Sequence, residues 1–61
     1  MPFVNIKLAG KITKQQKADI AKEVTESICR IANKTPESVL VLIEDIDKEQ
    51  WAKKGILVSD M

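Results

Sequence analysis

Histidine and tyrosine are absent from this 61-residue chain, and cysteine occurs only once, as Cys29. A single cysteine cannot form a disulfide within one chain, and without histidine or a cysteine cluster no metal site is expected. The two glycines do not form a phosphate-binding loop. We therefore predict neither a metal nor a cofactor, and we interpret Cys29 as a small, partly buried packing residue.

Aromatic residues are also scarce, and neither positive nor negative charge is in large excess. Phe3 and Trp51 are the aromatic side chains, and ten basic residues nearly balance nine acidic ones. This composition provides neither the basic stripe nor the stacking platform of a nucleic-acid-binding protein. No apolar run approaches the ~20 residues of a membrane span, and a signal-peptide pattern is lacking. We expect no nucleic-acid or membrane partner and a cytoplasmic location.

The length indicates one domain, residues 1–61, that is too small to be stabilised well by its own core. A chain of this size buries only about 60% of the surface that it exposes when unfolded. Disulfides and metals, the usual supports of mini-proteins, are excluded. Oligomerisation is the support that remains.

Two periodicities define the first half of the chain. Apolar residues alternate with others at the start, which predicts a strand with one apolar face formed by Val4, Ile6 and Leu8. A connection over residues 9–12 follows, and Thr13 with Gln16 has the spacing of a helix capping box. From Lys14 to about Ala32, apolar residues at spacings of three and four predict a helix whose inner stripe is Ile20, Ala21, Val24, Ile28, Ile31 and Ala32.

The second half of the chain predicts a further strand and a small C-terminal unit. Asn33 is suited to a left-handed helix cap, and residues 35–38 predict a short helical turn with Pro36 at its first position. Residues 39–43 are all apolar, as in a strand that is covered on both faces. Residues 45–61 predict a loop or hairpin and a weak strand over 56–58. The fold class is therefore α/β (α+β), a single β-α-β unit with parallel strands.

This β-α-β unit cannot cover its own apolar surface. One helix covers one face of a two-stranded sheet, whereas residues 39–43 are apolar on both faces. Two strands also leave two open edges. We therefore expect self-association.

Pro2 is the best candidate for chemistry in the chain. If Met1 is removed, the first strand begins with a secondary amine that the pyrrolidine ring holds rigidly. Burial and nearby positive charge can bring the pKa of such an amine near neutrality, where it serves as a general base. The plainer alternative is that Pro2 only begins an edge strand, where its missing N–H costs nothing.

The Met1-Pro2 start on a strand, a β-α-β unit of this length and the segment 48–55 (KEQWAKKG) together resemble the small 4-oxalocrotonate tautomerase family. The resemblance covers the whole chain. It implies that Pro2 becomes the N-terminal residue and that its amine moves a proton within a small enol-keto acid or 2-hydroxydienoate. It further implies dimers with a shared four-stranded sheet, assembled as a homohexamer, and an aromatic pocket wall at Trp51. Trp51 is equally consistent with an interface anchor.

The chain departs from the family at the positions of two arginines that bind substrate carboxylates. Leu40 occupies one of these positions. For the other, an ungapped comparison gives Ile12, and a shift of one residue gives Lys11 after Gly10. We predict Lys11 as the carboxylate partner, although lysine lacks the bidentate geometry of arginine. Lys53 and Lys54 are alternatives that would restore charge or simply remain exposed.

The resemblance leaves three functions to be compared. The predicted function is that of a tautomerase with Pro2 as catalytic residue and Lys11, Leu40 and Trp51 as substrate-binding residues. A relative that hydrates or decarboxylates another unsaturated acid would keep the fold. A non-catalytic oligomeric binding module would result if Met1 stays in place, because an amide nitrogen has no basicity.

Overall fold

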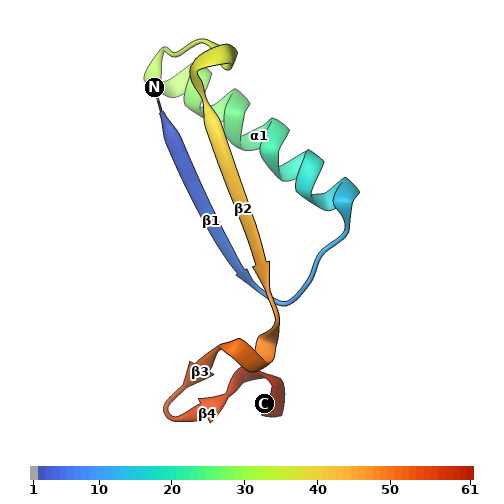
Figure 1. Cartoon of the computed structure of the whole chain (residues 1–61). Coiled ribbons are helices and arrows are strands. Elements are labelled where there is room, and N and C mark those ends of the chain that lie inside the picture. Colours follow the sequence, from blue (N-terminus) through green and yellow to red (C-terminus); the bar gives the residue numbers. More distant parts are fainter. Residues whose placement is uncertain (1) are drawn as a thin grey trace.

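The computed structural model describes residues 2–61, and these form a β-α-β unit followed by a separate small hairpin (Figure 1). In chain order the elements are β1 (Phe3–Ala9), α1 (Lys14–Ala32), η1 (Pro36–Ser38), β2 (Leu40–Ile46), η2 (Lys48–Gln50), β3 (Ala52–Lys53), β4 (Ile56–Leu57) and η3 (Val58–Asp60). The predicted fold class is confirmed. Within residues 2–61, no helix is long and apolar enough to cross a membrane.

The boundaries of α1 are set by the residues that the sequence pattern indicated. The Thr13 hydroxyl accepts the Gln16 amide N–H at 3.1 Å, and the Gln16 side chain accepts the Thr13 amide N–H at 2.9 Å. This capping box pairs two backbone donors that the first turn would otherwise leave free. Asn33 ends the helix in the left-handed conformation, with φ 58°.

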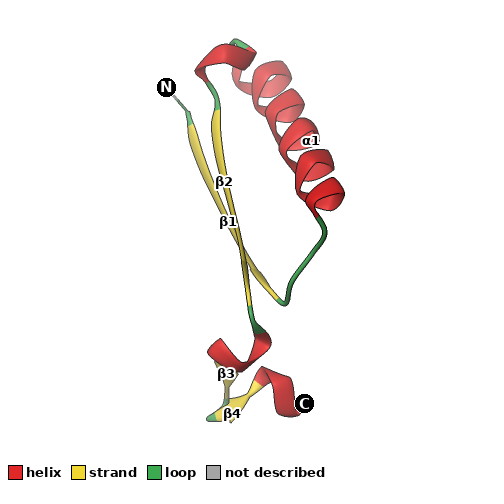
Figure 2. Ribbon diagram, turned by 45° about the vertical axis from the view of Figure 1, so that its right-hand side comes forward, coloured by secondary structure: helices red, strands yellow, loops and turns green. Residues whose placement is uncertain are grey.

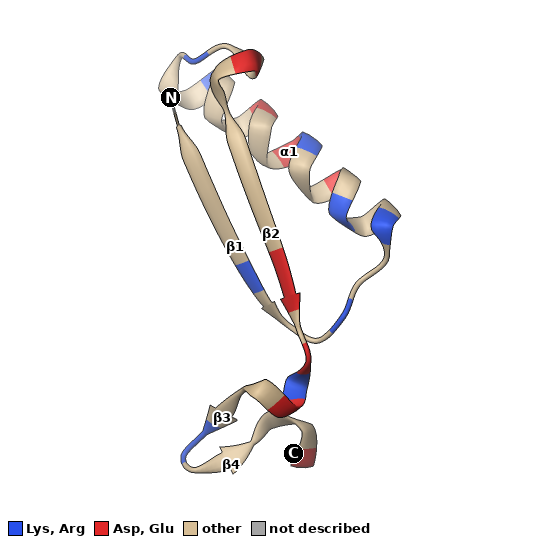
Figure 3. Cartoon of the chain, viewed as in Figure 1, with Lys and Arg blue, Asp and Glu red and all other residues tan. Residues whose placement is uncertain are grey.

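Strands β1 and β2 are parallel neighbours, and α1 lies on one face of the pair (Figure 2). Pairing of Val4 with Val41 and of Ile6 with Ile43 places half-buried side chains on the helix side. The opposite side, which we call the outer face, consists of the alternating pairs Phe3–Leu40, Asn5–Leu42, Lys7–Glu44 and Ala9–Ile46. Figure 3 shows that its end near the N-terminus carries no charge.

The second strand is longer than its apolar run and begins one residue later. The strand predicted over 39–43 is β2, Leu40–Ile46, so its bounds in the prediction were wrong. The prediction ended the strand at Ile43, the last residue of the apolar run, and so left out Glu44 and Asp45. Both charges find partners: Glu44 lies 3.9 Å from the Lys7 ammonium, and Asp45 lies 3.2 Å from that of Lys17.

The apolar stripe of α1 is also shorter than predicted. Ile20, Ala21, Val24 and Ile28 are half-buried, but Ile31 is 76% exposed and Ala32 is exposed. The stripe prediction was therefore wrong for these two residues.

The C-terminal unit is a hairpin that extends beyond the sheet, at the end opposite to the N-terminus (Figure 1). Strands β3 and β4 are antiparallel and joined by Lys54 and Gly55, which have φ values of 53° and 79°. Positive φ at both central residues is typical of a type I′ turn. The predicted weak strand over 56–58 was one residue too long, because Val58 begins η3.

The single chain has no closed core. None of residues 2–61 is fully buried, and the accessible surface is 4856 Å². A compact monomer of 6.8 kDa exposes about 4,000 Å². The radius of gyration is 14.5 Å, against about 10.5 Å for a compact domain of this length. The chain therefore has about 850 Å² more surface than a compact monomer would have.

Candidate active site

Pro2 lies at the amino end of the parallel sheet, beside the first residue of β2. Its carbonyl accepts the backbone N–H of Leu40 at 2.9 Å, so the two residues are joined across the strands. Pro2 is half-buried, and Leu40 is 54% exposed on the outer face, paired in register with Phe3. Met1 lies outside the described residues. The neighbours of Pro2 in the sheet, Phe3 and Leu40, are thus apolar and partly exposed in the single chain.

Lys11 lies at the opposite end of the same sheet, two residues after β1 ends. Its ammonium donates to the backbone carbonyl of Asp45 at 2.8 Å. The neighbouring Ile12 is half-buried, and its amide N–H donates to Oδ2 of Asp45 at 3.1 Å. Of the two residues that sequence comparison offered for this position, Lys11 has the exposed side chain and Ile12 the partly covered one.

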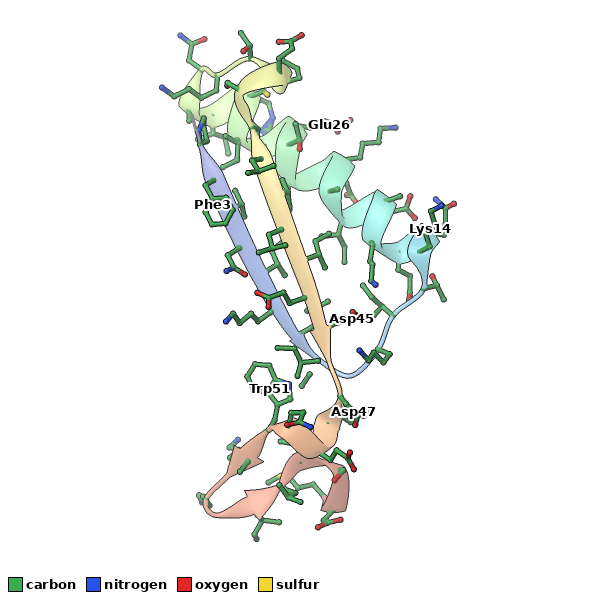
Figure 4. The ribbon with its side chains drawn as sticks, in the orientation of Figure 1. Phe3, Lys14, Glu26, Asp45, Asp47 and Trp51 are labelled. Atoms are coloured by element: carbon green, nitrogen blue, oxygen red, sulfur yellow. The ribbon has the colours of Figure 1, made fainter. Side chains whose placement is uncertain are left out.

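Trp51 also lies at this second end of the sheet. In Figure 4, Phe3 marks the amino end of β1, and Trp51 lies beyond the opposite end. It follows η2 directly, where its amide N–H donates to the Lys48 carbonyl at 3.2 Å. Its carbonyl accepts the Val58 N–H at 2.9 Å, which ties η3 back to the start of the hairpin. The indole N–H is hidden from solvent and has no acceptor among residues 2–61.

The four predicted site residues therefore form two groups, one at each end of the sheet. Pro2 and Leu40 are at the amino end, and Lys11 and Trp51 are beyond the carboxyl end. A seven-residue strand such as β1 is about 20 Å long. A small acid cannot bridge that distance, so one chain does not bring the two groups to a common substrate. Lys53 and Lys54 are exposed, at the end of β3 and in the turn that follows it.

Asp45 is a residue whose role sequence reasoning missed. It lies on the helix side of β2, opposite Leu8 in register, and its side chain is 13% exposed. One carboxylate oxygen accepts the Ile12 N–H, the other pairs with Lys17, and the carbonyl holds Lys11. The Ile12 N–H, and to a lesser extent the Lys17 ammonium, hold the pKa of Asp45 below its ordinary value of 3.8, although partial burial acts in the opposite direction. Asp45 therefore fixes the connection between β1 and α1.

Among residues 2–61, no three histidine, cysteine or acidic side chains gather in a way that could hold a metal ion.

Comparison with known proteins identifies the family. The sequence profile of tautomerase enzymes matches residues 2–61. The chain belongs to the tautomerase enzyme family. It is 33% identical over 61 residues to the 2-hydroxymuconate tautomerase of Bacillus subtilis, covering 100% of this chain and 98% of that protein. This tautomerase is therefore an isomerase of the 4-oxalocrotonate tautomerase type, as the resemblance implied.

Solved structures agree with the fold of this tautomerase. YwhB, a homologue of 4-oxalocrotonate tautomerase, superposes with a TM-score of 0.89 at 32% identity, with 98% of each chain covered. A subunit of the heterohexameric 4-oxalocrotonate tautomerase of Chloroflexus aurantiacus gives a TM-score of 0.90, covering 100% of this chain and 98% of that one. At 18% identity the latter likeness concerns the fold alone.

Proposed function

We propose that this tautomerase moves a proton within a small 2-hydroxydienoate or enol-keto acid, with the free amine of Pro2 as general base and acid. The amine takes the proton of the enol hydroxyl, and the O–H bonding electrons form the new carbonyl. The protonated amine then delivers a proton to the carbon two or four bonds further along the conjugated system, in a 1,3- or 1,5-transfer. The 33% identity to a 2-hydroxymuconate tautomerase supports this class of substrate.

The observation that carries the proposal is that Pro2 is half-buried, directly before β1, beside the apolar residues Phe3 and Leu40. A protonated amine is disfavoured where water is partly excluded, so the free base becomes available near neutral pH. The Leu40 N–H fixes the Pro2 carbonyl at 2.9 Å and thereby limits motion of the residue that carries the base. Rigid placement of a reacting group lowers the entropic cost of reaching the transition state.

The substrate pocket in this proposal is shared between copies of the chain. Pro2 and Leu40 come from one copy, and Lys11 and Trp51 come from another, as carboxylate partner and apolar wall. The distance between the two groups in one chain and the open outer face both support an assembly, either a dimer or a homohexamer of three dimers. The lone thiol of Cys29 is consistent with a cytoplasmic location, which we include in the proposal.

The test compares processed protein with protein that retains Met1. Intact mass gives the fraction processed, and turnover of a panel of enol and dienol acids is measured on both. We expect activity only from the processed form, with a kcat/KM that rises with pH through one ionisation below that of an ordinary proline amine. Pro2→Ala should keep part of the activity, because a primary amine is still a base but is less rigidly held.

Pro36→Ala is the control, since Pro36 lies in η1 and carries no free amine in either form. It should leave the dependence on processing unchanged. If protein that retains Met1 turns over substrate as fast as the processed form, after correction for its measured processed fraction, Pro2 is not the base and the binding-module alternative is preferred.

A further inference from the structure

A cleft lies beyond the carboxyl ends of β1 and β2 and is distinct from the surroundings of Pro2. Its volume is about 330 Å³, and its lining residues are Gly10, Lys11, Asp47, Lys48 and Ser59. Four of these residues follow directly after the two strands. In open parallel sheets, ligands bind at this position because the loops after neighbouring strands meet there.

Lys11 enters the cleft with its ammonium already positioned. Its Nζ donates one hydrogen bond to the Asp45 carbonyl at 2.8 Å. An ammonium has three donors, so two remain for a ligand. Within residues 2–61, Lys11 has no carboxylate partner, since the ion pairs are Lys7–Glu44 and Lys17–Asp45.

Lys48 is held in the cleft by its aliphatic stem. Gly10 has a φ of +102°, and a Cβ at this position would lie 3.1 Å from Cε and 3.6 Å from Cγ of Lys48. The stem therefore lies directly across the glycine backbone, where a larger residue would displace it. Like Lys11, Lys48 has no ion-pair partner within the described part of the chain.

The charge of the cleft favours an anion. Lys11 and Lys48 contribute two positive charges and Asp47 one negative charge. Oδ1 of Asp47 is already used, because it accepts the Glu49 N–H at 3.2 Å. The Ser59 hydroxyl from η3 is a further potential donor. Two lysines from separate segments thus line the cleft, and neither has a carboxylate partner within residues 2–61, so both are available to an anionic ligand.

We infer that Lys48 is a second cation of the substrate site and binds, together with Lys11, the carboxylate farther from the enol carbon. This inference rests on the proposed function, because the reacting carbons must lie at Pro2 of another copy. The only arginine of the chain, Arg30, lines a different groove on α1 and is not available here. Paired lysines supply the two-point contact that a single lysine lacks. Lys48 thus selects dicarboxylates over monocarboxylates.

Direct binding tests the inference without catalysis. Glutarate, a simple dicarboxylate, is titrated into the assembled wild-type protein while the backbone amide resonances of Gly10, Lys48 and Ser59 are followed. We expect saturable shifts that Lys48→Gln abolishes or weakens at least threefold. The matched control is Lys22→Gln, which removes the same charge from the exposed side of α1 and should leave the titration unchanged.

Kinetics on processed protein provide the second measurement. For a dicarboxylate 2-hydroxydienoate, Lys48→Gln should raise KM about three- to fivefold with kcat unchanged, the effect of one exposed charge pair. For an analogue with a phenyl ring in place of the distal carboxylate, KM should stay the same. Equal KM values for Lys48→Gln and Lys22→Gln on the dicarboxylate would refute the role of Lys48, as would the absence of glutarate shifts in wild type. Glutarate binding that depends on Lys48, without turnover of any enol acid, would instead refute the proposed function and leave the anion cleft in place.

Discussion

Substitution of Leu42 tests whether the chain is assembled or free in solution. The two cases predict very different losses in the free energy of unfolding. In the single chain Leu42 is 44% exposed on the outer face, next to Leu40 at 54% and Phe3 at 58%. If this face met only water, Leu42→Ala would lower the free energy of unfolding by about 0.5 kcal/mol, as surface substitutions do. If the face packs against another copy, the same change should cost about 2–5 kcal/mol per chain.

The surface area of the chain favours the assembled protein and therefore the larger loss in the free energy of unfolding. The excess over a compact monomer is about 850 Å², close to the roughly 800 Å² that each partner buries in a standard interface. Leu42→Asp should be more severe than Leu42→Ala, because an unpaired carboxylate in such an interface costs several kcal/mol. We expect Leu42→Asp to be dissociated or unfolded at micromolar concentration.

Sedimentation velocity and urea unfolding at several protein concentrations check this prediction. The unfolding midpoint of wild type should rise with protein concentration, as it does when assembly is linked to folding. Ile31→Ala is the matched control: Ile31 is also exposed and apolar, at 76%, but lies at the end of α1 and not on the outer face. A well-folded 6.8 kDa monomer with a concentration-independent midpoint, in which Leu42→Ala costs no more than Ile31→Ala, would refute the reasoning.

Three further predictions concern the connection between β1 and α1. Lys11→Ala should lower kcat/KM on a carboxylate substrate about tenfold to a hundredfold, mainly through KM, whereas Lys11→Arg should retain activity. If both variants have the same kinetics as wild type, Ile12 is preferred as the pocket residue. Because the pKa of Asp45 is lowered on folding, its stabilising effect is present above its ordinary value of 3.8 and disappears as the pH falls through the lowered value. Asp45→Asn should therefore be less stable than wild type at pH 7, with a difference that shrinks in acid unfolding curves below that value; a constant difference would contradict this. Thr13→Ala should cost about 1 kcal/mol in urea unfolding by removing the hydroxyl that accepts the Gln16 N–H, and Thr13→Ser should restore most of it.

Local sequence signals predicted the elements of the fold well where one residue decides the outcome. The Thr13–Gln16 capping box and the left-handed Asn33 are confirmed, because a side chain that satisfies backbone groups acts within a few residues. The end of β2 was predicted too early because it depends on long-range partners. Glu44 and Asp45 belong to the strand since Lys7, Ile12 and Lys17 reach them from other elements.

The sequence proposed the residues of the candidate site but did not indicate how they are arranged. A Met-Pro start and a late tryptophan are visible in the sequence, whereas the separation of Pro2 from Lys11 follows from the parallel direction of two strands. Asp45 has no sequence signal beyond its charge, and its three contacts appear only once α1 is packed on the sheet. Likewise, the sequence indicated only that Lys48 lies in a loop or hairpin segment. The packing of its side chain against Gly10 appears only in the structure.

Asp45 also limits how the chain length can vary between β1 and α1. The Ile12 N–H, the Lys11 ammonium and the Lys17 ammonium all reach this one residue, and the Gly10 N–H donates to the next carbonyl along β2, at 2.6 Å. Insertion or deletion of a single residue over 10–13 would break several of these bonds at once. Surface loops normally tolerate such changes. Homologues that retain an acidic residue here should therefore share a connection of constant length, so that divergence at this point occurs by exchange of side chains and not by gaps.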